Sequence, residues 1–271
     1  GIVLYNDNDI KLIKTKGKVA DLKALISQED TTANIGIGHT RWATHGVPND
    51  VNSHPHTSMS GNLVIVHNGI IENYDTLKKE LESRGYTFKS DTDTEVLINL
   101  IEEIQISKKL KLGKAVQLAL NQVFGAYAIA VFDKTKPNEI VVARLGSPIA
   151  IGIGKDNSEF FIASDASPYI EYTKDTIYLD DEEMAIIRLD RDIKVRKISN
   201  DSLIDPNIEE LQLNLEQIEK GGYDHFMLKE IFEQPKAIID TYRGRMMAHE
   251  GVIQMSGVED NLEKFLNARR I

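Results

Sequence analysis

The sequence predicts an α+β fold built in layers. Helical patterns dominate residues 74–122, whereas residues 126–198 carry short apolar or alternating runs. Turn residues separate these runs at intervals typical of antiparallel sheets, and no helix joins them as a parallel crossover would. Helices gathered in the first half and strands in the second favour the α+β class in layers.

The predicted strands share short length, apolar or alternating side chains and flanking turn residues. They span residues 1–5, 10–16, 35–38, 63–66, 126–132, 139–144, 149–153, 160–163, 176–179, 184–189 and 193–198.

The predicted helices span residues 21–27, 74–84, 91–104 and 114–122, then a helix through 233, another starting near 235, and a last one over 261–270. Asn73 is expected to cap the second of them and Gly85 to end it. Asp93 lies in the first turn of the third, where an acidic residue is more often a cap than a carboxylate that holds an ammonium group.

A change in composition near Asp201 divides the chain. Residues 1–200 form the predicted main domain, and residues 201–271 form a linker that reaches toward another domain.

Composition narrows the possible functions. The 271 residues carry a net charge of −10, which disfavours a nucleic acid as partner. No apolar run reaches the length of a membrane span, and no signal peptide is present. The absence of cysteine excludes disulfides and thiolate metal sites and fits a cytoplasmic protein.

Residues 39–69 concentrate the chemically useful side chains, including five of the seven histidines. Arg41 offers a fork of donors that matches a carboxylate. The amide of Asn68 and the backbone N–H of Gly69 form a natural pair of oxyanion donors, although Asn-Gly is more often a hairpin turn. The histidines lack the spacing of a helical zinc motif, so no metal is predicted.

Four motifs follow one another along residues 39–95. They are His-Thr-Arg-Trp-Ala-Thr-His-Gly at 39–46, Asn-Ser-His-Pro-His at 52–56, His-Asn-Gly-Ile-Ile-Glu-Asn at 67–73 and Thr-Asp-Thr-Glu at 92–95. Together they closely resemble the glutaminase domain of glucosamine-6-phosphate synthases, the isomerising glutamine–fructose-6-phosphate aminotransferases. Residues 144–148, 163–165 and 229–235 agree, so the resemblance covers nearly the whole chain.

The resemblance implies the four-layer α/β/β/α sandwich of N-terminal-nucleophile hydrolases, with a C-terminal helical linker. It implies a domain that hydrolyses L-glutamine to supply ammonia for making glucosamine 6-phosphate from fructose 6-phosphate, the first step of amino-sugar (UDP-N-acetylglucosamine) biosynthesis. The implied partners are L-glutamine, a sugar-isomerase domain of the same polypeptide and, through that domain, a second copy. No cofactor, metal, nucleic acid or membrane is implied.

The resemblance also assigns roles to residues. Arg41 would hold the α-carboxylate of glutamine and Asp93 its α-amino group. Trp42 would belong to a loop that closes over glutamine. The side chain of Asn68 and the backbone of Gly69 would form the oxyanion hole.

Thr44 and His45 would line the same pocket as Arg41.

One departure from the family is serious. Members use an N-terminal cysteine as nucleophile, and this chain has none. By this resemblance, Gly1 would correspond to the last glycine of the family's Arg-Gly-Tyr-Asp-Ser-Ala-Gly segment. Because the cysteine nucleophile is missing, we expect the chain by itself to be inactive. The alternatives are a non-catalytic glutamine-binding or regulatory module and another class II amidotransferase, such as an amidophosphoribosyltransferase.

Overall fold

A computed structural model describes residues 1–6, 9–41, 46–189, 191–211, 222–242, 246–247, 252–253 and 262–268. Contacts divide the chain into two compact units, Gly1–Gln212 and Leu213–Ile271. The first unit therefore includes strands after residue 200 that the sequence placed in the linker. The roles assigned to the two parts stay a prediction.

A seven-stranded antiparallel sheet forms the centre of the first unit, in the order β13-β12-β11-β7-β6-β5-β4. Its strands are β4 (His56–Thr57), β5 (Leu63–Ile71), β6 (Gly125–Asp133), β7 (Ile140–Leu145), β11 (Glu183–Ile187), β12 (Lys194–Lys197) and β13 (Leu203–Ile204). The longest pairing joins β5 to β6 over nine residues, from Leu63 opposite Asp133 to Ile71 opposite Gly125.

Two smaller antiparallel sheets complete the strands of this unit. The first, in the order β14-β10-β8-β9, contains β8 (Ala150–Ile153), β9 (Phe160–Ala163), β10 (Asp175–Tyr178) and β14 (Ile208–Glu210). The second, in the order β2-β1-β3, contains β1 (Ile2–Asn6), β2 (Asp9–Ile13) and β3 (Ile35–Gly38).

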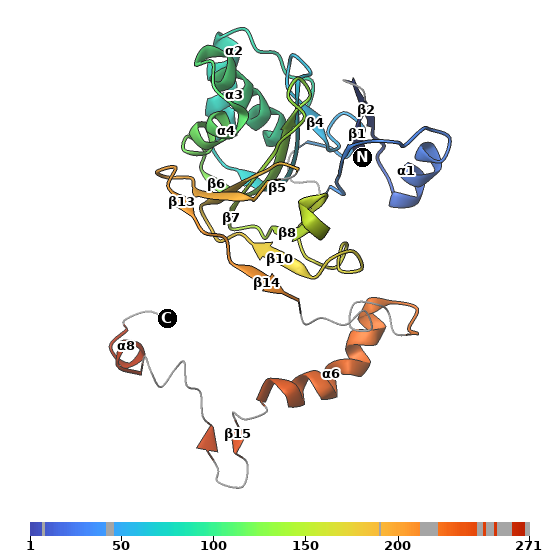
Figure 1. Cartoon of the computed structure of the whole chain (residues 1–271), viewed down its shortest axis with the longest axis vertical. Helices are drawn as coiled ribbons and strands as arrows, with labels where there is room; N and C mark the ends of the chain where they lie inside the picture. The colour runs from blue at the N-terminus through green and yellow to red at the C-terminus, as the bar shows by residue number, and fades with distance from the viewer. Residues whose placement is uncertain are drawn as a thin grey trace. The chain divides into compact units, whose positions relative to one another are not determined.

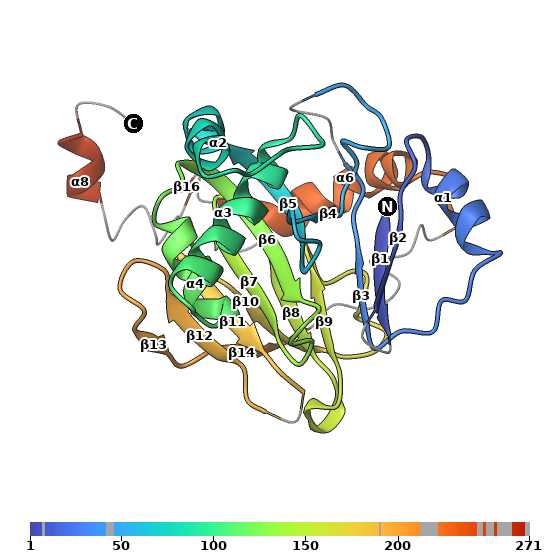
Figure 2. The ribbon, with the colours of Figure 1, turned by 90° about the horizontal axis from the view of Figure 1, so that it is seen from above.

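The helices and sheets of the first unit lie in layers (Figures 1 and 2). Buried apolar side chains pack each layer against the next. Helices α2 (Tyr74–Ser83), α3 (Asp93–Ser107) and α4 (Leu112–Leu120) cover one face of the central sheet, where Leu97 and Ile101 pack with Ile129. The opposite face packs on the two smaller sheets, through Val142 with Ile151 and through Phe132 with Val3. Each such fully buried side chain contributes roughly 1.5–3 kcal/mol by removal from water. The predicted α+β class is confirmed.

The remaining helices of this unit are short. Helix α1 (Val19–Ile26) buries no side chain, and a 3₁₀ turn, η1, spans Lys155–Asn157.

Asn73 does not do what the sequence predicted. It precedes α2, but its side chain makes no capping hydrogen bond. Its amide instead donates to Gln122 O at 2.9 Å and accepts from Phe124 N–H at 2.9 Å. The side chain therefore ties the start of α2 to the start of β6. Gly85, with φ +91°, follows the helix as expected.

The second unit contains α6 (Phe226–Tyr242), a two-stranded ribbon of β15 (Met246–Met247) and β16 (Val252–Ile253), and α8 (Leu262–Leu266). The sequence predicted one helix ending at Glu233 and another starting near Pro235. That break is wrong, because α6 continues through Pro235. Proline removes one hydrogen bond, yet its fixed φ is helical. Among the described helices, none is long and apolar enough to cross a membrane.

Candidate active site

Asn68 and Gly69 lie inside strand β5, opposite Ala128 and Tyr127 of β6. The hairpin-turn interpretation of this pair is therefore wrong. Gly69 has φ +132°, and a Cβ added there would lie 2.0 Å from Ala126 O. Only glycine fits this backbone conformation beside this neighbour.

Gly69→Ala is expected to lower the free energy of unfolding by about 3 kcal/mol or more, through backbone strain and overpacking together. Gly61→Ala is the matched control, because Gly61 also has positive φ (+74°) but nothing lies within 4 Å of its added Cβ. That variant should lose only about 1–2 kcal/mol. Urea unfolding of both variants measures the difference, and equal losses would contradict the close-approach argument.

Asp93 begins helix α3 but is not its cap. Thr92 has that role, since its Oγ1 accepts from Glu95 N–H at 3.3 Å. The buried carboxylate of Asp93 accepts from Ile71 N–H at 2.8 Å and from Thr94 N–H at 3.0 Å. The interpretation of Asp93 as a helix cap is wrong, and its carboxylate instead joins α3 to the end of β5.

Arg41 is half-buried, and its guanidinium lies 3.5 Å from Gly46 O. Partial burial lowers the pKa of Arg41, and the negative charge of Asp93 opposes this shift. The charges of Arg41 and Asp93 therefore interact, and Asp93 is bound to the end of β5. This combination suits a zwitterionic amino acid, whose carboxylate and ammonium need opposite partners.

Asn52 joins the backbone at Val47 to Asp91, two residues before α3. Asn52 donates to Val47 O at 3.0 Å and to Asp91 Oδ2 at 3.1 Å, and it accepts from Asp91 N–H at 3.0 Å. Trp42, Thr44 and His45, to which the sequence assigned substrate contacts, lie outside the described residues.

Three histidines, His54, His56 and His67, form a hydrogen-bonded network with two threonines. Thr94 Oγ1 lies 3.0 Å from His67 Nδ1 and 3.3 Å from His54 Nε2, and Thr92 Oγ1 lies 3.2 Å from His56 Nε2. Burial lowers the pKa of His54 far below its usual range and that of His56 to about 3. His54 and His56 are therefore uncharged at neutral pH.

Within the described ranges, no group of three His, Asp or Glu side chains is placed to hold a metal ion. Sequence reasoning missed the network because it tested the histidines only as metal ligands. The signal was present in the spacing, since His54 and His56 are two residues apart, as are Thr92 and Thr94.

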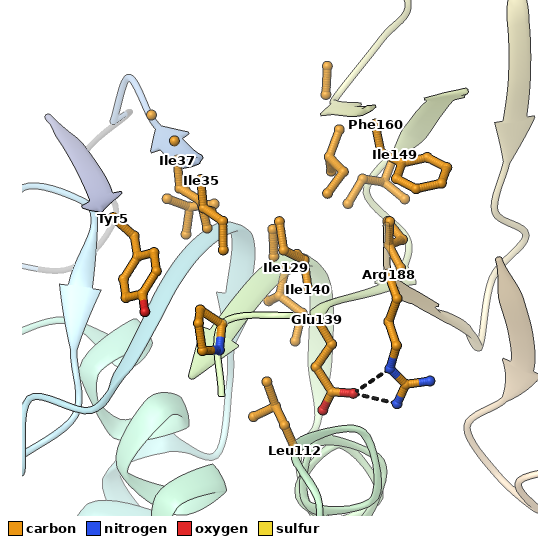
Figure 3. A pocket seen from close by; sticks show the side chains of 18 of the residues that line it. Tyr5, Ile35, Ile37, Leu112, Ile129, Glu139, Ile140, Ile149, Phe160 and Arg188 are labelled. Atoms are coloured by element: carbon orange, nitrogen blue, oxygen red, sulfur yellow. Dashed lines mark hydrogen bonds and ion pairs between the residues drawn. The ribbon is translucent and has the colours of Figure 1, made fainter. Parts of the chain in front are cut away.

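A cavity of about 1770 Å³ opens beside the site and is lined by both His39 and Asn68. Figure 3 shows further lining side chains, with Tyr5 and Ile35 on one side and Phe160 on the other. Such a volume exceeds the roughly 300–1,000 Å³ of ordinary ligand pockets, so a molecule as small as an amino acid would fill only part of it.

Within this cavity, Glu139 accepts two hydrogen bonds from Arg188, at 3.0 and 2.5 Å (Figure 3). Each charged group of this pair is therefore satisfied within the wall of the cavity.

A family model described as a glutamine amidotransferase domain matches residues 18–212. The chain belongs to this family. The match contains Arg41, Asn68, Gly69 and Asp93, and its end coincides with the end of the first compact unit. The matched residues thus include the central sheet, its three covering helices, the sheet of β8, β9, β10 and β14, and strand β3.

Two relatives with curated names are similar to this chain over its whole length. The chain is 52% identical to glutamine–fructose-6-phosphate aminotransferase (isomerizing) of Bacteroides thetaiotaomicron and 48% identical to that of Chlorobaculum tepidum. Each alignment covers all of this chain and 44% of the relative, so the glutamine amidotransferase domain and its tail span less than half of these proteins.

A solved structure shows the same fold. Glutamine phosphoribosylpyrophosphate amidotransferase from B. subtilis superposes with a TM-score of 0.60 at 27% identity, over 73% of this chain and 42% of that one. The amidotransferase domain therefore has the sandwich of N-terminal-nucleophile hydrolases that the sequence predicted.

Proposed function

We propose that this chain is the glutamine-hydrolysing part of an isomerising glutamine–fructose-6-phosphate aminotransferase. The whole protein would convert L-glutamine and D-fructose 6-phosphate into L-glutamate and D-glucosamine 6-phosphate. The family match and the two named relatives support this assignment. With it come a sugar-isomerase domain in the same polypeptide, a homodimer formed through that domain, and a cytoplasmic location.

One observation carries the proposal for the substrate: the bond from Ile71 N–H to the Asp93 carboxylate. Ile71 lies two residues along β5 from Gly69, so this bond holds an anion close to the proposed oxyanion donors. The same anion interacts electrostatically with Arg41. Glutamine would bind with its α-ammonium at Asp93 and its α-carboxylate at Arg41. Trp42, Thr44 and His45 would complete the pocket.

The amide of bound glutamine would extend toward Asn68 and Gly69. Their N–H groups would stabilise the oxyanion that forms when a thiolate attacks the amide carbon. The C–N bond then breaks, ammonia leaves with an added proton, and water hydrolyses the thioester to glutamate. The 271 residues contain no cysteine, so the thiol would come from outside them. The cavity beside Asn68 gives such a group room to approach.

The test uses the whole natural protein with L-glutamine and fructose 6-phosphate. We expect release of glutamate and glucosamine 6-phosphate in equal amounts. The 271-residue chain alone is expected to bind glutamine without hydrolysing it. Release of glutamate without glucosamine 6-phosphate would overturn the proposed overall reaction but would still support the glutaminase activity.

A non-catalytic glutamine-binding module is the second candidate, favoured by the absence of cysteine from these residues. It predicts that the whole protein binds glutamine and releases no glutamate at all.

A further inference from the structure

We propose that His39 is a positioning residue, which holds the side-chain amide of Asn68 in the orientation that binds an oxyanion. The inference rests on the proposed function, in which Asn68 is an oxyanion donor. His39 directly follows β3, and its Nε2 lies 2.7 Å from Asn68 Oδ1. Both residues line the cavity in which glutamine would react.

The orientation matters because an asparagine amide has two unlike ends of nearly equal size. The Nδ2 end donates two hydrogen bonds, whereas the Oδ1 end only accepts. Rotation of the amide by half a turn would present Oδ1 to the oxyanion and repel it. A donor fixed at Oδ1 removes that second orientation and leaves Nδ2 directed elsewhere, which is the arrangement that oxyanion stabilisation needs.

His39 meets this need in only one neutral tautomer. Its Nδ1 is buried and has no hydrogen-bond partner among the described residues. A proton on Nδ1 would be a buried unsatisfied donor, and Nε2 would then face Oδ1 as a second acceptor. With the proton on Nε2, the 2.7 Å contact is a hydrogen bond from His39 to Asn68. Burial lowers the pKa of His39, so the ring is neutral at ordinary pH.

The histidine network fixes the plane of the His39 ring. That ring stacks on His54, with centroids 4.4 Å apart and planes 22° apart. His54 is held at both nitrogens, because Nδ1 accepts from His67 N–H at 3.3 Å and Nε2 lies 3.3 Å from Thr94 Oγ1. His39 therefore cannot turn freely, and its hold on Asn68 is set before any substrate arrives.

The test compares His39→Gln with His39→Asn in the whole natural protein, by glutamate release at varied glutamine concentration. A glutamine side chain can place its amide nitrogen near the former Nε2, whereas an asparagine side chain is too short. We expect His39→Asn to lower kcat about tenfold, the loss of one hydrogen bond, with KM unchanged. His39→Gln keeps the hydrogen bond, so its kcat for glutamate release should stay within about threefold of that of the unchanged protein.

The same pair is then built on Asn68→Ala, where no amide remains to be positioned. There, His39→Asn should have no further effect on kcat. A tenfold loss in both backgrounds would overturn the proposal, as would a change in KM alone or equal losses in the Gln and Asn variants. Absence of glutamate release by the unchanged protein would refute the proposed function itself, and an unaltered kcat in Asn68→Ala would refute the oxyanion role on which His39 depends.

Discussion

Asn68→Ala in the whole protein is expected to lower kcat for glutamine hydrolysis by about 10²- to 10³-fold, with little change in KM. The reason is that an oxyanion exists in the transition state and not in bound glutamine, so its donor contributes only there. Asn68 lies within β5, whose pairing to β6 fixes the backbone on both sides of it. Steady-state glutamate release measures both constants.

Two further variants sharpen this prediction. Asn68→Asp keeps an oxygen that accepts from His39 but loses the donor, so its kcat should fall at least as far as that of the alanine variant. Asn62→Ala makes the same chemical change just before the other end of β5 and should leave kcat unaltered. An effect of Asn68→Ala confined to KM would contradict the oxyanion assignment.

Most of the longer strands were predictable because they obey a local rule, whereas the short strands β4, β13 and β14 were not predicted. Segments such as β7 and β11 are short apolar runs bounded by turn residues, and burial against two neighbouring layers explains why. The extension of β5 through Asn68 and Gly69 was not predictable in this way. Local propensity favours a turn at Asn-Gly, but nine pairs with β6 outweigh it.

The partners of polar side chains were the least predictable. Asn73 has the right position for a cap, yet Gln122 and Phe124, distant in sequence, bind its amide. Asp93 likewise bonds to Ile71 rather than capping its own helix. The partner of a buried polar side chain depends on which backbone groups the fold leaves unpaired. A local sequence pattern does not contain that information.

Arg41→Ala is expected to raise KM for glutamine about 10²-fold or more, the cost of leaving one charge of a hydrogen-bonded pair without its partner. The α-carboxylate lies far from the reacting amide and is held in the ground state and the transition state alike, so kcat should change much less. Synthesis of glucosamine 6-phosphate from free ammonia should persist. Arg41→Lys keeps the charge but loses the planar fork, and an intermediate KM is expected.

A glutamine analogue with a neutral amide in place of its α-carboxylate tests the contact directly. The unchanged protein should discriminate against this analogue by about the same factor that Arg41→Ala loses with glutamine, because both changes remove the same ion pair. The Arg41→Ala variant should no longer distinguish the two substrates. If it still does, a different residue holds the carboxylate. If ammonia-dependent and glutamine-dependent synthesis fall equally, Arg41 supports the structure of the whole protein and not the binding of glutamine.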